Sequence, residues 1–280
     1  MHRILTTDLI HDYERHLILE ERSAGTIRKY MRDVLFFFSY LPASKSIDKK
    51  TVIQYKEHLA ERYAVSTANS MLAAVNGLTA FAGWYECHVK PLKQQRRIFR
   101  STDRELSKSE YLRLLNAAKA RGNSRLFHLM QTLGTTGIRI SELRYITVEA
   151  VKQGQAVVNC KGKIRTILLV KKLRRVLIGY CRENGLTSGP VFVTKTGRPM
   201  NRSNIWMEMK RLCDSAGVDA GKVFPHNFRH LFAVTYYHLE KDIAKLADIL
   251  GHASINTTRI YIMESGAEHI RQMERLGLVV

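Results

Sequence analysis

The chain has 280 residues, 45% of them hydrophobic, which is enough for one large domain or two ordinary ones. Its formal net charge is +20, with +6 on residues 1–100 and +14 on the rest, so the charge is not confined to a basic tail. The simplest partner for this charge is a polyanion, most commonly nucleic acid, although a basic protein can also be only solvated or bind a membrane surface.

The N-terminal residues and the spacing of the cysteines indicate the cellular compartment in which the protein is expected. Residues 1–16 contain no apolar signal core, and no apolar run approaches the length of a membrane span. The cysteines include no C-x-x-C pair and lie far apart, at Cys87, Cys160, Cys181 and Cys213. This spacing argues against a zinc ribbon or a disulfide framework. We therefore expect a protein of the reducing cytoplasm.

Residues 1–90 predict a small helical bundle. Apolar residues recur at helical spacing in four stretches between residues 9 and 84, and strand signals are absent. Ser66 or Thr67 is expected to cap the fourth helix. The aromatic residues on these helices are more often core than base-stacking surfaces, so the bundle alone does not indicate a function.

Residues 91–106 have the composition of an interdomain linker. The stretch begins with Pro91, has no apolar period and is strongly basic. A strap that crosses a phosphate backbone needs such charge, although it can also be only solvated. The basic residues in question are Lys93, Arg96, Arg97 and Arg100.

Residues 107–280 predict a second, mainly helical domain. It opens with S-K-S-E at 107–110, the pattern of a capping box. Further on, Gly137 permits a tight turn and Ser141 is expected to cap the helix that follows. Arg139 therefore stands at a helix entry, a favourable place for an anion.

One β-hairpin is expected within this domain. Residues 155–169 alternate apolar and polar side chains, with Lys161 and Lys163 on either side of Gly162 at the turn. Lysines at a hairpin tip are often only solvated, so the pattern alone is a weak functional signal. A later helix, from Asn204 to about Ser215, carries the basic pair Lys210 and Arg211.

The stretch 224–261 holds the most distinctive chemistry. Its first helix starts at Pro225 and carries His226 and Arg229 three residues apart, so both side chains share one face. An arginine offers a planar fork of donors that matches phosphate oxygens, and imidazoles donate hydrogen bonds or move protons near neutral pH.

Two more short helices complete the stretch. Asp242 is expected to cap the first of them and Gly251 to end it, which leaves His252 just outside the helix. Ser254 is expected to cap a final helix that carries Tyr261. A tyrosine becomes a nucleophile where nearby positive charge favours the phenolate. Together these side chains suit attack on a phosphodiester.

A zinc site is the alternative for part of this stretch. His226 and His230 have the i, i+4 spacing of metal ligands. The metalloprotease pattern requires a glutamate directly after the first histidine, and Asn227 stands there instead. Arg229 would also place a fixed cation beside the metal, which disfavours this interpretation.

Taken together, these motifs resemble the tyrosine recombinases, the phage-integrase and Xer family, over nearly the whole chain. TTGIRISEL resembles the family's first arginine box, FPHNFRHLFA its H-x-x-R box and LGHASINTTRIY its LGH…Y box. The resemblance implies a mainly α fold with a small β-hairpin or sheet (α+β). It also implies a helical, SAM-like core-binding domain at 1–90, a basic linker at 91–106 and a catalytic domain at 107–280.

The resemblance also implies roles for single residues. Tyr261 is expected to attack the scissile phosphate and form a 3′-phosphotyrosine. Arg139 and Arg229 are expected to hold the non-bridging oxygens, where charge builds in the transition state. His226 is expected to assist proton transfer, and His252 to hydrogen-bond the phosphate.

A hairpin lysine is expected to protonate the leaving 5′-oxygen. The family's hairpin usually reads G-K-G-x-K-x-R, whereas this chain has CKGKIR, one residue shorter. We favour Lys161 by its position before Gly162 and keep Lys163 as the alternative. The residues expected to bind DNA are Lys93, Arg96, Arg97, Arg100, Lys163, Arg165, Lys210 and Arg211.

The implied function is site-specific DNA recombination, in the integration, excision or resolution of DNA or a mobile element. The expected partners are double-stranded DNA and further copies of the chain, as a tetramer on paired sites, with no metal and no cofactor. A catalytically silent DNA-binding protein would not need the two arginines, His252 and Tyr261 together. A type IB topoisomerase uses similar chemistry but relaxes DNA without site preference.

Overall fold

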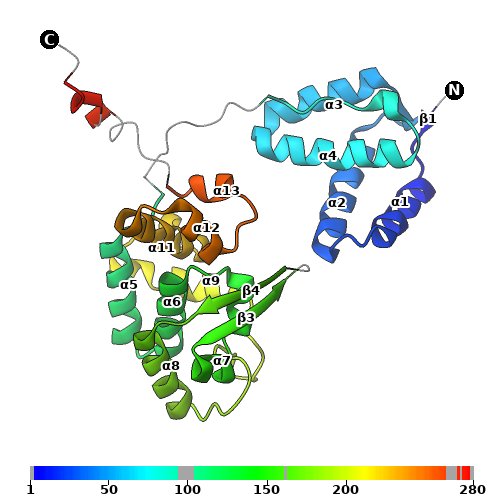
Figure 1. Ribbon diagram of the computed structural model, residues 1–280. Helices are drawn as coiled ribbons and strands as arrows, with labels where there is room; N and C mark the ends of the chain where they lie inside the picture. The colour runs from blue at the N-terminus through cyan, green and yellow to red at the C-terminus, as the bar shows by residue number, and fades with distance from the viewer. Residues whose placement is uncertain (1–2, 94–103, 161–162, 263–269, 272, 278–280) are drawn as a thin grey trace. The chain divides into compact units, whose positions relative to one another are not determined.

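The computed structural model describes residues 3–93, 104–160, 163–262, 270–271 and 273–277. The chain divides into two compact units, Met1–Arg97 and Ile98–Val280, and the division falls within the stretch predicted as a linker (Figure 1). In the described parts of the chain, helices dominate both units and the strands form two small antiparallel pairs, which confirms the predicted fold class. Within the described ranges, no helix combines the length and the apolar character needed to cross a membrane.

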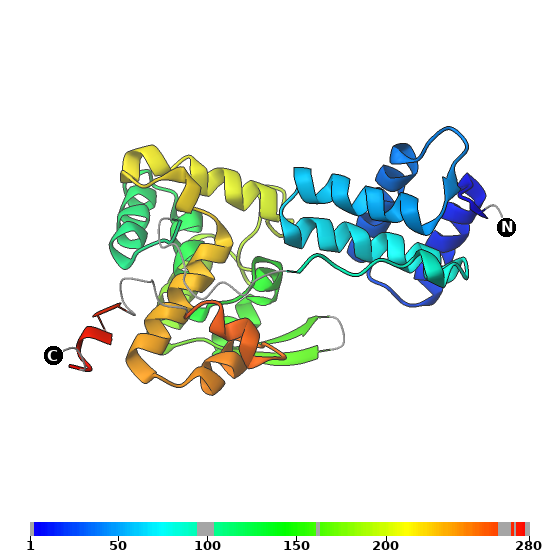
Figure 2. The same cartoon turned by 90° about the horizontal axis from the view of Figure 1, so that it is seen from above.

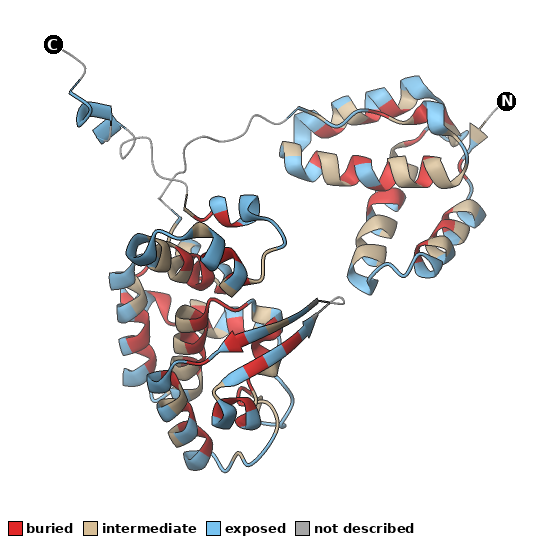
Figure 3. Ribbon diagram, viewed as in Figure 1, coloured by how far each residue is buried: buried red, intermediate tan, exposed pale blue. Residues whose placement is uncertain are grey.

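Between residues 3 and 93, the first unit consists mainly of four α-helices. They are α1 (Thr7–Leu19), α2 (Ala24–Tyr40), α3 (Lys49–Arg62) and α4 (Val65–Phe81), followed by the short η1 (Tyr85–Cys87). Each helix buries one side, as the distribution of buried positions shows (Figure 3), and α4 packs against the other three. The rings of Phe37 and Tyr55 lie 4.7 Å apart at the centre of the core. The predicted helical bundle is confirmed.

Two details of this unit differ from the prediction. Arg3–Ile4 (β1) pairs with Ser46–Ile47 (β2), although no strand was expected. Strands of two residues are too short to show an alternating pattern. Helix α4 begins after Ala64 without a side-chain cap, because Ser66 and Thr67 lie inside its first turn.

The second unit is arranged around α6 (Ser124–Thr136). This helix packs against α5 (Lys108–Ala120), α8 (Lys171–Glu183), α9 (Arg202–Lys210) and α11 (Pro225–Glu240). The capping box predicted at the start of α5 is present. The smaller elements are η2 (Ile140–Tyr145), α7 (Val148–Gln153), α10 (Cys213–Ala216), η3 (Ala220–Lys222), α12 (Ile243–Leu250) and α13 (Ile255–Arg259).

The predicted hairpin is also present. Strand β3 (Gln155–Cys160) pairs antiparallel with β4 (Lys163–Leu168), and the two strands project from the helices of their unit (Figure 2). The alternation sets one face of the hairpin on the core and leaves the other in solvent. Ala156, Val158 and Ile167 are buried, whereas Val157, Ile164 and Leu168 are exposed.

Tight helix ends prepare the site. Gly137 ends α6 with a left-handed φ of 60°, and a Cβ atom there would collide with Phe232. The predicted caps of the later helices are confirmed, with Asp242 before α12 and Ser254 before α13. The Ser141 cap was wrong, because the next element is the 3₁₀ helix η2, which already starts at Ile140. The N-terminus of η2 is instead capped by Glu142, a residue within the helix, whose carboxylate accepts from the Arg139 backbone N–H.

Candidate active site

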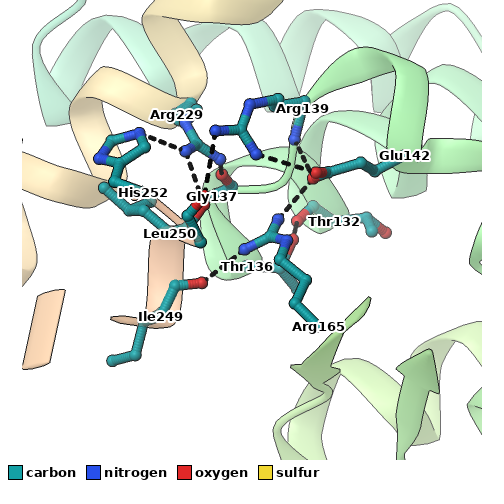
Figure 4. Close-up of polar contacts among 11 residues, drawn as sticks. Thr132, Thr136, Gly137, Arg139, Glu142, Arg165, Arg229, Ile249, Leu250 and His252 are labelled. Atoms are coloured by element: carbon teal, nitrogen blue, oxygen red, sulfur yellow. Dashed lines mark hydrogen bonds and ion pairs between the residues drawn. The ribbon is translucent and has the colours of Figure 1, made fainter. Parts of the chain in front are cut away.

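Arg229, the fifth residue of α11, is enclosed by protein and only 2% exposed. Its Nη1 donates to the Gly137 carbonyl at 2.6 Å, and its Nη2 donates to the Leu250 carbonyl at 2.8 Å (Figure 4). These carbonyls end α6 and α12, where the helix dipoles favour a cation. Burial, followed by the charge of Arg139, lowers the pKa of Arg229 to about 10, so it remains charged at neutral pH.

His252 lies directly beyond α12 and contacts the same guanidinium. Its Nε2 is 2.7 Å from Arg229 Nη2, and its Nδ1 is 2.8 Å from the Thr258 hydroxyl. Burial, followed by the charges of Arg229 and Arg139, lowers its pKa to about 4, so the ring is neutral at pH 7. Because an arginine can only donate, Nε2 accepts, and the proton sits on Nδ1.

Tyr261 lies among three imidazole rings. The ring of His252 stacks on it at 5.6 Å with an interplanar angle of 4°, and the rings of His226 and His230 lie at 5.4 and 5.6 Å. His230 is 2% exposed, and its Nε2 donates to the Tyr261 carbonyl at 2.9 Å. Tyr261 itself is 8% exposed and packs in a small cluster formed by α11 and α12. The fold thus brings His226, Arg229, His252 and Tyr261 together.

Arg139 stands at the edge of this group. Its Nη1 donates to Glu142 Oε1 at 3.0 Å, and its Nη2 lies 3.4 Å from the Gly251 carbonyl. With its side chain 43% exposed, it borders solvent, whereas Arg229 is buried behind it. Two guanidiniums of different exposure therefore meet beside His252, an arrangement suited to an anion with several oxygens.

Arg165, on β4, was expected to contact DNA, but it points into the protein. Its Nη1 donates to the Ile249 carbonyl at 2.7 Å, and its Nη2 forms an ion pair with Glu142 at 2.5 Å (Figure 4). The side chain is 14% exposed, and that of Glu142 is 3% exposed. Burial by itself raises the pKa of Glu142, but hydrogen bonds from Arg165 and Arg139 outweigh it and keep that pKa below its ordinary value.

The hairpin lysines are only partly covered by the structure. Lys161 lies outside the described residues. Lys163 is the first residue of β4, and the structure describes its backbone. The choice between them as the general acid stays a prediction.

The other residues predicted to bind DNA are only partly covered by the structure. Lys93 is exposed, and the other predicted linker contacts, Arg96, Arg97 and Arg100, lie outside the described residues. At the end of α9, Lys210 contacts the Ala220 carbonyl and lies 5.3 Å from the centre of the Trp206 ring, and Arg211 is exposed.

Three residues of the site were not predicted from the sequence. Glu142 orders two arginines, His230 holds the backbone of Tyr261, and Thr258 accepts from His252. Glu142 has a usable signal, because it follows Arg139 by three residues, the spacing of a capping box. His230 was considered only as a metal ligand. Among the described residues, no group of three or more His, Cys, Asp or Glu side chains is placed to hold a metal ion.

The comparisons with known proteins identify the class. Residues 104–268 match the phage integrase family, and residues 10–86 match the phage integrase N-terminal SAM-like domain. The chain therefore belongs to the phage integrase family.

Individual relatives agree with this. The chain is 27% identical to tyrosine recombinase XerD of Halalkalibacterium halodurans, over 85% of this chain and 87% of the relative. It is also 27% identical to tyrosine recombinase XerA of Pyrococcus furiosus, over 99% of this chain and 96% of the relative. Its fold is similar to that of a lambda integrase(75-356) dimer bound to a COC' core site, with a TM-score of 0.74, 17% identity, and coverage of 95% and 97%. A XerH recombinase bound to difH gives a TM-score of 0.67 at 20% identity, over 90% of this chain and 79% of the other.

Proposed function

We propose that this protein is a site-specific DNA recombinase that cuts and rejoins DNA strands through a 3′-phosphotyrosine intermediate. The observation that carries the proposal is the placement of Tyr261 against the ring of His252, whose Nε2 contacts the buried Arg229 guanidinium. A potential nucleophile and a preformed site for phosphate oxygens thus share one histidine. Family membership and the tyrosine recombinase relatives support the same function.

The first step is transesterification at the scissile phosphate. The Tyr261 hydroxyl oxygen attacks phosphorus and gives up its proton to His226, whose ring lies at 5.4 Å. Arg139 and Arg229 hold the two non-bridging oxygens, where negative charge increases in the transition state. Because Arg229 is fixed by two carbonyls before DNA arrives, little reorganisation is needed during the reaction.

The bond that breaks joins phosphorus to the 5′-oxygen. An alkoxide is a poor leaving group, so a lysine of the hairpin, Lys161 in our assignment and Lys163 in the alternative, donates a proton to it. The products are a 3′-phosphotyrosyl ester and a free 5′-hydroxyl. The ester preserves the energy of the original bond, so that a 5′-hydroxyl from another strand can reverse the step without ATP.

His252 changes its role when phosphate enters. In the free protein its Nε2 accepts from Arg229, so that atom carries no proton to offer. To hydrogen-bond a phosphate oxygen, Nε2 must become protonated. The negative charge of the phosphate favours that proton and offsets the cations that lower the pKa.

The domain plan follows from the same function. We assign residues 1–90 to a core-binding domain, 91–106 to a basic linker and 107–280 to the catalytic domain, which together bind double-stranded DNA in the cytoplasm. A neighbouring fold is that of a lambda integrase tetramer bound to a Holliday junction, which supports assembly as a tetramer on paired sites. The contacts we assign to DNA are those of Lys93, Arg96, Arg97, Arg100, Lys163, Lys210 and Arg211.

A trapping experiment tests the function and finds the DNA site. The protein is incubated with nicked fragments of genomic DNA, covalent adducts are isolated under denaturing conditions, and the trapped ends are sequenced. We expect one enriched sequence with protein on the 3′ side of the break, and strand exchange between two copies of it. Adducts spread without sequence preference, together with relaxation of supercoils, would favour a type IB topoisomerase instead.

A further inference from the structure

Three consecutive backbone carbonyls at the end of α12 accept from three different arginines. The Ile249 carbonyl accepts from Arg165 and the Leu250 carbonyl accepts from Arg229 (Figure 4). The Gly251 carbonyl accepts a longer hydrogen bond from Arg139, at 3.4 Å. The last carbonyls of a helix have no partner within the helix, and they form the negative end of its dipole. The carbonyls at the end of α12 therefore hold the three guanidiniums side by side.

Arg165 differs from the other two in how its donors are used. Its guanidinium bridges the Ile249 carbonyl and the Glu142 carboxylate, with 14% of the side chain exposed against 43% for Arg139. A guanidinium that is held by a carbonyl and a buried carboxylate, with only 14% of its side chain exposed, is poorly placed to reach a DNA phosphate.

Glu142 transmits the position of Arg165 to Arg139. One carboxylate oxygen accepts from Arg165 and from the Arg139 backbone N–H, and the other accepts from the Arg139 guanidinium. A buried carboxylate with these partners has little freedom to move, so a shift of Arg165 moves Arg139 as well.

Gly251 provides the space that this arrangement needs. Its φ is +64°, and a Cβ atom there would collide with the side-chain stem of Arg165. The glycine thus serves both the end of α12 and the passage of Arg165 toward Glu142.

We propose that Arg165 is a positioning residue, which fixes Glu142 and the end of α12 so that Arg139 and Arg229 face the scissile phosphate. The inference rests on the proposed function, because it assigns Arg165 to the phosphate-binding arginines of that reaction. It also replaces the expectation that Arg165 contacts DNA.

The first test compares Arg165→Met with a matched control. Arg125 makes an equivalent bridge in the same unit, with Glu208 at 2.8 Å and the Val193 carbonyl at 2.9 Å, outside the arginine cluster. Single-turnover covalent trapping is measured at saturating protein, and half-site binding is measured against salt. We expect Arg165→Met to trap about 10- to 100-fold more slowly, as a small misplacement of catalytic groups does, with its salt dependence unchanged. The Arg125→Met protein should trap at the wild-type rate.

The second test separates positioning from general loss of structure. Arg165→Lys keeps a cation beside Glu142 but lacks the planar guanidinium that reaches two acceptors at once. Compared with Arg165→Met, it should therefore recover thermal stability but not the rate of covalent trapping. Because Arg165 reaches Arg139 through Glu142, Arg165→Met should slow trapping by a smaller factor in an Arg139→Ala background than in the wild-type protein, and the part that remains acts through the end of α12 and Arg229.

Two results would overturn the inference. One concerns DNA binding by Arg165→Met. If its DNA affinity depends on salt with a slope reduced by about one ion, while its trapping rate at saturation is unchanged, Arg165 contacts a phosphate. The other concerns the double variant. If the factor by which it slows trapping equals the product of the factors for Arg165→Met and Arg139→Ala, the two residues have independent roles. Absence of trapping in the wild-type protein would contradict the proposed function, and with it the inference.

Discussion

Replacing Arg229 by methionine should abolish most activity while leaving the protein folded, because two contributions to stability oppose each other. The substitution removes the donors to the Gly137 and Leu250 carbonyls, each of which then loses a buried partner. An unpaired buried carbonyl costs about 1–3 kcal/mol, so the loss amounts to about 2–6 kcal/mol. Methionine fills much of the same space, which limits the cavity left behind.

An opposing contribution comes from the buried charge itself. The shift of the Arg229 pKa from 12.5 to about 10 corresponds to a cost of about 3 kcal/mol that burial, followed by the charge of Arg139, imposes on the charged form. Removing the cation recovers this cost. The net destabilisation should therefore be at most about 3 kcal/mol, or about 6–12 °C in Tm for a domain of this size.

The effect on catalysis should be much larger. Loss of one preorganised donor to a developing oxyanion slows a reaction by about 10²–10³. Single-turnover trapping at saturating protein gives this rate, and calorimetry gives Tm. Arg113→Met is a suitable control, because Arg113 also donates to two carbonyls at a helix end, those of Ala216 and Gly217. It should lose stability without losing trapping.

Two outcomes would refute this reasoning. Unfolding of the Arg229→Met protein at room temperature would mean that the burial cost of the cation has been overestimated. Wild-type trapping by a folded Arg229→Met protein would remove Arg229 from the phosphate site.

Further predictions concern the pH, salt, leaving group and metal dependence. Because the folded pKa of His252 is about 4 against an ordinary 6.5, its ring should stay neutral in the free protein down to about pH 4. Wild-type protein should then lose stability relative to His252→Gln as pH falls from 6.5 to 4; a ring that titrates near 6.5 by ¹⁵N NMR would contradict this. DNA affinity should fall steeply with salt, given the charge of +20, and a flat dependence would exclude extensive phosphate contact. Lys161→Ala should slow cleavage, and a 5′-phosphorothiolate should restore it, since sulfur leaves without a proton; the same rescue in Lys163→Ala would move the assignment. Trapping should persist in EDTA, and its loss with recovery on adding a metal would overturn the mechanism.

Local chemistry explains which parts of the fold were predictable. The caps at Asp242 and Ser254 and the stop at Gly251 depend on single residues and their neighbours, so the sequence suffices for them. The same holds for the hairpin, whose alternation is visible in the chain. The sequence predicts an α-helix capped by Ser141 after Arg139, where the structure has a 3₁₀ helix. α-Helices and 3₁₀ helices share the same start signals, so the sequence does not distinguish them.

The site was predictable in its reactive residues and not in their supports. His226, Arg229, His252 and Tyr261 have distinctive types and spacings, and the fold brings them together. The direction of Arg165 could not be predicted, since it depends on Ile249, which is 84 residues away in the chain. The partnership of His230 with the Tyr261 carbonyl likewise depends on how α11 and the end of α13 pack.

The central claim is that Tyr261 is the nucleophile, and the most direct test maps the covalent adduct. Tyr261→Phe removes only the hydroxyl oxygen, so the ring should keep its place among the three imidazoles and half-site binding should be unchanged. On a nicked suicide substrate, the wild-type protein should be trapped on the 3′ side of the break, with a free 5′-hydroxyl and the adduct on the Tyr261 peptide. Tyr261→Phe should give no adduct. Trapping that persists in Tyr261→Phe, or an adduct on the peptide of Tyr236 or Tyr237, would contradict the claim.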